Sequence, residues 1–263
     1  MLAQLLEPVK AVLIAAMIFI PFERLAPANR RQRVFRDGWA TDVVTGIANG
    51  LLLYVALLGS LAAIDAAAGF AVPHLRTWVA TRPLAAQAIA AVVIGDLGVY
   101  GVHRLLHTVP WLWRFHAIHH SAEEMDWLIA LRFHAVDLLL SRLASLGLLV
   151  ALNVAPAALA AFVVVFAWQS WLAHANVRIS YGPLSRVLVS PEFHHWHHSA
   201  DRDAYNMNYA NVLALWDVVF GTAYLPIGRT PDRFGIDERV PASYAGRFFF
   251  PFERRPDQTS VGK

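Results

Sequence analysis

Long uncharged runs alternate with short polar segments along the chain. Residues 43–64 form a run of 22 positions without a charged side chain. Because a helix of about 20 apolar residues crosses a bilayer, this run predicts a membrane span. Residues 11–22 are either a first crossing that begins near Leu2, which we favour, or a partly inserted segment. Residues 83–102 form a third run interrupted only by Asp96.

The longest uncharged run, residues 143–173, has 31 positions. As one helix it would be about 46 Å long, which exceeds a hydrocarbon core of about 30 Å. Extended back to Val136, the run instead predicts a helical hairpin with its turn at Asn153 and Pro156. The predicted fold class is therefore all-α, an integral membrane helical bundle of about four to five spans or with a re-entrant hairpin.

The segment between the first two apolar runs is rich in arginine and predicts the orientation. Its five arginines are Arg24, Arg30, Arg31, Arg33 and Arg36. By the positive-inside tendency this segment is cytoplasmic, and counting crossings places residues 103–134 and those after 174 there too, as a helical cap. The Ala- and Arg-rich composition favours a bacterial inner membrane, and no removable signal peptide is expected. The three predicted regions are N-terminal spans and loops over 1–82, a catalytic region over 83–228, and a polar C-terminal tail over 229–263.

Composition supports the membrane interpretation and limits the possible chemistry. The chain is 57% hydrophobic and only 16% charged, with a mean hydropathy of +0.45. Its arginines are not interleaved with aromatic residues, and its net charge is only +3, so no nucleic-acid partner is expected. The absence of cysteine excludes disulfides, thiolate iron–sulfur clusters and a cysteine nucleophile. Any metal must therefore bind histidine, carboxylate or carbonyl groups.

Ten of the twelve histidines follow a pattern that indicates metal binding. One pair is spaced four apart on a predicted helix, so both imidazoles lie on one face. The spacing His-x-x-His-His occurs twice, in HAIHH and in HHWHH, and two single histidines lie where an apolar run meets the predicted cap. The predicted ligands are His103, His107, His116, His119, His120, His134, His174, His194, His197 and His198.

A structural role is the ordinary interpretation of a lone histidine at a membrane boundary, and a single His-x-x-x-His pair is a weak signal. Two copies of one spacing on the same predicted side favour a shared metal site, because a cation requires neutral imidazoles and removes their mutual repulsion. His74 is expected at the surface. His195 is expected beside the ligands, although a register in which it replaces His194 is also compatible with the spacing.

The number of imidazoles exceeds what one ion binds, since zinc takes four ligands and octahedral iron six. We predict two ions with about five nitrogen ligands each, which leaves an open position on each ion for chemistry. Imidazole binds zinc, copper, iron and nickel, so these residues do not by themselves select iron.

These residues resemble the fatty acid hydroxylase/sterol desaturase superfamily of membrane di-iron oxidoreductases. The similarity covers roughly residues 90–225, and one position departs from it, because members often carry proline where this chain has Ala135. The matching pieces are Asp96-x3-Tyr-x2-His103-Arg-x2-His107, His116-x2-His119-His120-Ser, Arg132-Phe-His134, His174-x-Asn176, His194-x2-His197-His198-Ser and Asn208-Tyr-x6-Trp216-Asp-x2-Phe-Gly-Thr222.

The resemblance implies an enzyme of lipid biosynthesis that uses two Fe ions and O₂ to hydroxylate or desaturate a fatty acyl, sterol-like or other long apolar substrate. It implies a separate electron donor of the cytochrome b5, ferredoxin or reductase kind, since the chain has no flavin or haem motif. No catalytic residue is predicted beyond the metal centre. Supporting roles around the ligands are expected for Asp96, Tyr100, Asn176 and Asp217. A carboxylate inside an apolar helix needs a partner, so Asp96 is expected to orient a ligand histidine, with a polar tie between helices as the alternative.

Three other interpretations are compatible with the sequence. An ether-lipid monooxygenase of the alkylglycerol type, which uses tetrahydrobiopterin, belongs to the same superfamily. A zinc-dependent membrane hydrolase would need a carboxylate near the ligands as general base, and Glu123, Glu124 and Glu192 are available. A metal-transport or storage protein would place ligands along a route through the membrane, whereas these histidines gather at one predicted face.

Overall fold

The computed structural model describes residues 6–226 and 228–253, and in these ranges its regular secondary structure is helical, apart from two isolated bridges. The α-helices are α2 (Glu7–Leu25), α3 (Trp39–Ala71), α4 (Pro73–Ala80), α5 (Leu84–Thr108), α6 (Pro110–His120), α7 (Ala135–Arg142), α8 (Leu148–Ala151), α9 (Pro156–His174), α10 (Pro191–His197), α11 (Leu215–Val219) and α12 (Tyr244–Phe249). The short 3₁₀ segments are η1 (Trp127–Leu131), η3 (Gly182–Arg186), η4 (Arg202–Ala204) and η5 (Phe250–Phe252), and η2 (Leu143–Gly147) is a π-helical turn.

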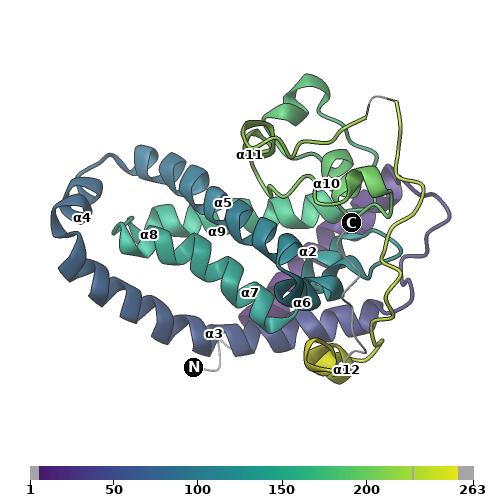
Figure 1. Cartoon of the computed structure of the whole chain (residues 1–263), viewed down its shortest axis with the longest axis horizontal. Coiled ribbons are helices and arrows are strands. Elements are labelled where there is room, and N and C mark those ends of the chain that lie inside the picture. Colours follow the sequence, from purple (N-terminus) through teal and green to yellow (C-terminus); the bar gives the residue numbers. More distant parts are fainter. Residues whose placement is uncertain (1–5, 227, 254–263) are drawn as a thin grey trace.

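Helix α5 packs on α9, and the segments α7, η2 and α8 lie between α5 and α3, with α4 at one end of the bundle and the short helices α6, α10 and α12 towards the other (Figure 1). Helices α3, α5 and α9 are the ones long and apolar enough to cross a membrane among the described residues. The chain is therefore a membrane protein built on a helical bundle, as the uncharged runs predict.

The number of spans predicted from the sequence differs from the number of long apolar helices in the structure, and the predicted first crossing is one cause of the difference. Helix α2 has the length of a span, but its 19 residues include the charged side chains Glu7, Lys10, Glu23 and Arg24. It is therefore not among the helices apolar enough to cross a membrane. It packs instead against Trp127 through Phe19, in a cluster of buried apolar side chains. Where the sequence predicts four to five spans, the structure has three helices apolar enough to cross, together with α2 and the continuous segments α7, η2 and α8.

The predicted hairpin is confirmed. Segments α7, η2 and α8 follow one another without a break and form its first arm, and α9 forms the second. Asn153 lies in the turn with a φ of 59°, a left-handed conformation that asparagine tolerates better than most residues. Helix α9 then begins at Pro156, where the missing N–H of proline costs no helical hydrogen bond.

Helix α5 packs closely on the hairpin at Gly98. A Cβ at this position would clash with the backbone oxygen of Ala144 in η2, whereas a Cβ at Gly101, three residues along α5, would meet nothing within 4 Å. The absence of a side chain at Gly98 therefore permits the close approach of the two elements.

Gly98→Ala should lower the thermal stability of the protein in detergent, by roughly the 1–3 kcal/mol that overpacking costs, because backbone must shift to admit the methyl group. Gly101→Ala is the matched control on the same helix. It should leave the unfolding temperature unchanged or slightly higher, since alanine favours a helix by about 1 kcal/mol over glycine. Equal unfolding temperatures for the two variants would contradict this account of the packing.

Part of the predicted C-terminal tail is folded. Residues 244–249 form α12, which contacts α3, and Arg247 and Phe250 are buried. The last ten residues, expected as a loose end, lie outside the described residues.

Candidate metal centre

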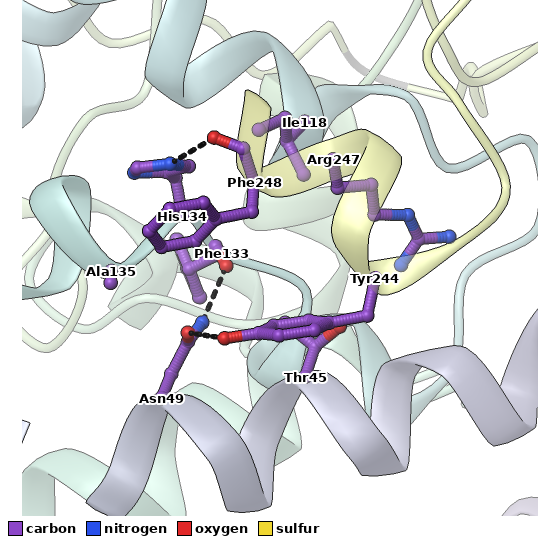
Figure 2. A pocket seen from close by; sticks show the side chains of 9 residues that line it. All are labelled: Thr45, Asn49, Ile118, Phe133, His134, Ala135, Tyr244, Arg247 and Phe248. Carbon is purple, nitrogen blue, oxygen red and sulfur yellow. Dashed lines mark hydrogen bonds between the residues drawn. The ribbon is translucent and has the colours of Figure 1, made fainter. Parts of the chain in front are cut away.

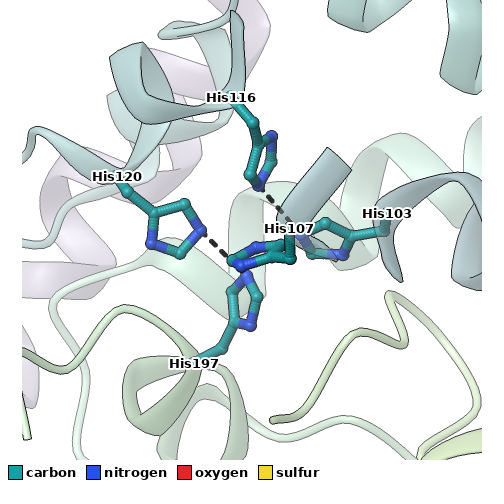
Figure 3. A group of neighbouring side chains, drawn as sticks. All are labelled: His103, His107, His116, His120 and His197. Carbon is teal, nitrogen blue, oxygen red and sulfur yellow. Dashed lines mark hydrogen bonds between the residues drawn. The ribbon is translucent and has the colours of Figure 1, made fainter. Parts of the chain in front are cut away.

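Nine histidines converge at the end of the bundle where α5 and α9 finish. Within each of two groups, one ring nitrogen per residue lies within 4.8 Å of the others. Metal–nitrogen bonds of about 2.0–2.1 Å place ligands on opposite sides of an ion about 4 Å apart, so this spacing suits one ion per group. The five-histidine group, drawn in Figure 3, is His103, His107, His116, His120 and His197. The four-histidine group is His119, His174, His194 and His198.

The two His-x-x-His-His motifs contribute to both groups in a reciprocal way. In α6, the outer pair His116 and His120 faces the five-histidine group, while His119 faces the four-histidine group. In α10 the assignment is reversed: the outer histidines belong to the four-histidine group and His197 to the five-histidine group. Residues four apart share a helix face, and the residue at the third position lies far enough around the helix to reach the neighbouring site.

Hydrogen bonds orient four of these rings by their Nδ1 atoms. Carbonyl and carboxylate oxygens only accept, so each Nδ1 carries the proton and each Nε2 presents its lone pair to the group. The four bonds run from His103 to the Tyr209 carbonyl (2.6 Å), from His116 to Asp137 Oδ2 (2.7 Å), from His174 to the Ser170 carbonyl (2.6 Å) and from His197 to the Met207 carbonyl (2.7 Å).

This orientation brings lone pairs face to face. The Nε2 atoms of His103 and His116 are 3.0 Å apart, and neither carries a proton while both rings are neutral. In the four-histidine group, Nε2 of His174 lies 2.9 Å from Nε2 of His194, close enough for one ion to bind both nitrogens. A shared cation removes the repulsion between such lone pairs. The donor set thus fits a metal ion in each group.

Five of these rings lie in surroundings that favour the neutral form, as metal binding requires. Burial, and then the neighbouring imidazoles, hold the pKa of His119, His120 and His198 well below the ordinary value for histidine. The same causes lower the pKa of His194 and His197. A protonated cluster would repel itself in a site from which water is largely excluded, so the fold favours the metal-binding state of these side chains.

The model of one protein family, described as fatty acid hydroxylase, matches residues 88–222, and that range contains all nine histidines. The chain belongs to the fatty acid hydroxylase family. An ornithine lipid hydroxylase, OlsE of Rhizobium tropici, is 33% identical over 251 residues, which cover 92% of this chain and 74% of that protein.

Other members of the fatty acid hydroxylase family match the chain over shorter stretches. Human alkylglycerol monooxygenase is 35% identical over 128 residues, 48% of this chain and 28% of that protein. Cholesterol 25-hydroxylase of Rattus norvegicus is 28% identical over 145 residues, 53% of this chain and 47% of that protein. No solved structure matches the chain. Membership and these relatives make the chain an oxidoreductase that acts on lipid, as the resemblance predicts.

The fatty acid hydroxylase assignment agrees with the absence of carboxylates from both groups. Among the described residues, neither group contains an aspartate or glutamate, so Glu123, Glu124 and Glu192 do not join the histidines as the zinc hydrolase interpretation requires. The histidines also gather at one end of the bundle instead of along a path through it, which is the opposite of what a transport route predicts.

His134 is the predicted ligand that the structure leaves outside both groups. Its Nδ1 accepts the backbone N–H of Val136 at 3.1 Å, and its Nε2–H donates to the carbonyl of Phe248 at 3.0 Å. With both nitrogens engaged, His134 has no lone pair directed at a metal. His195 also lies outside the groups, with Nε2 3.1 Å from the Ala175 carbonyl, in agreement with its expected place beside the ligands.

Among the described residues no hydrogen bond joins Asp96 to a histidine, so it does not orient a ligand by direct contact. Its carboxylate accepts the backbone N–H groups of Val212 and Leu213, at 3.0 and 2.8 Å. Asp217 holds the same loop by accepting the N–H groups of Tyr209 and Ala210, both at 2.8 Å, and burial raises its pKa to about 6. Since the Tyr209 carbonyl binds His103, both aspartates act on that ligand through the backbone.

The other two expected supporting residues also act at a distance. The hydroxyl of Tyr100 lies 3.0 Å from that of Thr222, which donates to Asp217 at 2.7 Å. The side chain of Asn176 bonds the backbone of Asn29 through both its oxygen, at 2.8 Å, and its nitrogen, at 3.1 Å. Tyr100 therefore extends the support of the Tyr209 loop, and Asn176 ties the N-terminal segment to the end of α9.

Asp137 and Phe133 contact the histidines, and no role was predicted for either. Asp137 binds His116, and the ring of Phe133 stacks on that of His119 with centroids 3.9 Å apart and planes at 15°. Asp137 carried a usable signal, because it is a carboxylate in the first turn of a largely apolar segment. Phe133 carried none, since one aromatic residue among many does not stand out in a sequence.

Proposed function

We propose that this protein is a membrane-bound di-iron enzyme that hydroxylates a polar membrane lipid with O₂. The observation that carries the proposal is the convergence of nine imidazoles in two adjoining groups, without a carboxylate among them. The coordination pattern suits several metals, and the choice of iron is supported by the family to which the chain belongs. Desaturation of the same substrate is the related outcome that the experiment below distinguishes.

In this proposal some residues of the chain hold the metal ions, and others orient the histidines that hold them. Inward-facing nitrogens of the five- and four-histidine groups would each hold one iron, and the Nδ1 partners fix the ring orientations. When bound, the two irons supply the reduction of O₂ and the oxidation of a C–H bond. The net reaction is R–H + O₂ + 2 e⁻ + 2 H⁺ → R–OH + H₂O.

The two electrons come from a separate donor of the cytochrome b5, ferredoxin or reductase kind, because the chain carries no flavin or haem motif. Burial of the histidines limits the access of water to the site. The neighbouring apolar helices α5 and α9 would allow a lipid chain to reach it from the bilayer.

An ornithine-containing or similar amino-acid lipid is the first substrate to test. This choice is supported by the relative described as an ornithine lipid hydroxylase, whose similarity extends over 92% of this chain. An ether lipid is the second candidate, favoured by the match to human alkylglycerol monooxygenase, although that match covers less than a third of the longer protein.

We also propose a bacterial inner membrane with the histidines on the cytoplasmic side. Arg24, Arg30, Arg31 and Arg33 are exposed, and they belong to a segment that contacts the histidine end through the bond from Gln32 to the Met125 carbonyl, at 2.8 Å. Exposed arginines at one end of a helical bundle favour its placement in the cytoplasm.

Purification in detergent, metal analysis and turnover with ¹⁸O₂ test the proposal. We expect about two irons per chain, and ¹⁸O in the lipid product when reductant, a donor and an ornithine or ether lipid are supplied. A new double bond in the lipid, without ¹⁸O label, would show that the reaction is desaturation and not hydroxylation. A single zinc with no O₂ uptake would overturn the proposed chemistry.

A further inference from the structure

Helix α12 contacts residues 132–134, a segment that lies beside both groups of histidines. In the sequence the helix follows this segment by more than a hundred residues. Figure 2 shows α12 against the beginning of α3 and the residues Phe133, His134 and Ala135. The space enclosed between these elements is about 10 Å³, room for about one water molecule. This contact is therefore a packed junction and leaves no room for a substrate.

Three consecutive residues, 132 to 134, are each bound to α12 directly or through one side chain of α3. Arg132 shares Asp42 with Arg247: the two guanidinium groups donate to Oδ1 of that aspartate at 2.8 and 2.6 Å. One residue further, the Phe133 carbonyl accepts from Asn49 Nδ2 at 2.8 Å, and the Tyr244 hydroxyl donates to Asn49 Oδ1 at 3.3 Å.

His134 forms the third connection. Its Nδ1 caps the N-terminus of α7 by accepting the N–H of Val136, so the proton is on Nε2 and is donated to the Phe248 carbonyl of α12. A single neutral tautomer satisfies both bonds. The histidine thus couples the start of α7 to α12.

The segment fixed in this way touches a predicted ligand in each metal group. The ring of Phe133 stacks on His119 of the four-histidine group, at a centroid distance of 3.9 Å. Asp137, in the first turn of α7 that His134 caps, binds Nδ1 of His116 of the five-histidine group at 2.7 Å. Displacement of this segment would therefore misplace one ligand of each group.

We propose that α12 is a C-terminal clasp that positions His116 and His119 for metal binding, with Tyr244, His134 and Arg247 as its positioning residues. The inference rests on the proposed metal centre and adds to it a role for a segment expected to be a tail. Outer-shell partners of metal ligands typically contribute 10- to 100-fold to metal affinity, and that range sets the expected size of the effect.

The test is Tyr244→Phe combined with Arg247→Met in the full chain, with cobalt(II) titrated into the metal-free protein. Asp42 keeps Arg36 and Arg132 in this variant, so the fold should persist. We expect cobalt affinity to fall about 10- to 100-fold, with an altered visible spectrum because the ligand geometry relaxes. The matched control is Tyr205→Phe combined with Arg233→Met, which changes an exposed tyrosine and an exposed ion pair and should leave binding unchanged.

A folded clasp variant with the parent's cobalt affinity and spectrum would overturn the inference. If that variant does not fold, Phe133→Leu provides the second test, because it removes the ring stacked on His119 and keeps the backbone carbonyl. This variant should weaken binding of one cobalt ion only, and undiminished binding of both would equally overturn the inference. Absence of metal binding by the parent protein would instead refute the metal centre itself.

Discussion

His174→Ala should reduce the metal content of the purified protein from about two ions per chain to about one and abolish lipid oxidation. His174 belongs to the four-histidine group, so its loss leaves only three nitrogens there. Its Nδ1 is fixed by the Ser170 carbonyl, and its Nε2 lies 3.1 Å from that of His119 and 2.9 Å from that of His194. Loss of an orienting partner already costs 10- to 100-fold, so loss of a ligand should leave less than about 1% of the activity.

The five-histidine group provides a graded comparison. His197→Ala leaves four nitrogens in that group, enough for a four-coordinate ion. This variant should keep more metal than His174→Ala while losing most of its activity, because the remaining geometry is altered. Metal analysis by mass spectrometry and oxygen uptake measure the two effects separately.

His195→Ala is the matched control. It removes an imidazole from α10, the helix that carries His197, but this imidazole lies outside both groups. The variant should retain about two ions per chain. Full metal content in His174→Ala, or the loss of one ion in His195→Ala, would show that the two groups are assigned incorrectly.

The parts of the fold that rest on local pattern were predictable. The uncharged runs located α3, α5 and α9, and the excessive length of residues 143–173 required the hairpin that Asn153 and Pro156 form. Histidine spacing selected eight of the nine residues that converge, because the i, i+3 and i+4 positions of a helix have a defined direction. Of the two single histidines predicted as ligands, His174 joins a group and His134 does not.

The remaining features depend on tertiary contacts that no local pattern encodes. The division of each His-x-x-His-His motif between two groups follows from how α6 and α10 face each other, and the role of His134 follows from a carbonyl more than a hundred positions away. Arg36 was interpreted as a topology signal, yet it is buried between Asp42 and Asp126. A charge count cannot distinguish a solvated arginine from one that forms a buried ion pair.

Asp42 is the centre of that buried network and the residue whose loss should most affect the fold. The carboxylate is fully buried and accepts from Arg36 Nη2 at 2.7 Å, from Arg132 Nε and Nη2 at 2.8 and 2.9 Å, and from Arg247 Nη1 at 2.6 Å. An ionised carboxylate offers about four lone-pair sites, and these donors occupy them. The three arginines come from the N-terminal segment, the loop before α7 and the C-terminal helix α12, so a single side chain joins three distant parts of the chain.

Asp42→Ala should therefore destabilise the protein by about 3–5 kcal/mol, the cost of leaving buried charges without their partner. Only Asp126 then remains to pair Arg36, and Arg132 and Arg247 lose the carboxylate that both share. A large fall in unfolding temperature in detergent and early proteolysis near α12 are the expected results. Asp37→Ala is the control, because Asp37 is almost fully exposed in its pair with Arg33 and such pairs contribute at most about 1 kcal/mol. Equal unfolding temperatures for the two variants would mean that the arginines find other partners or water, and that Asp42 does not hold the three segments together.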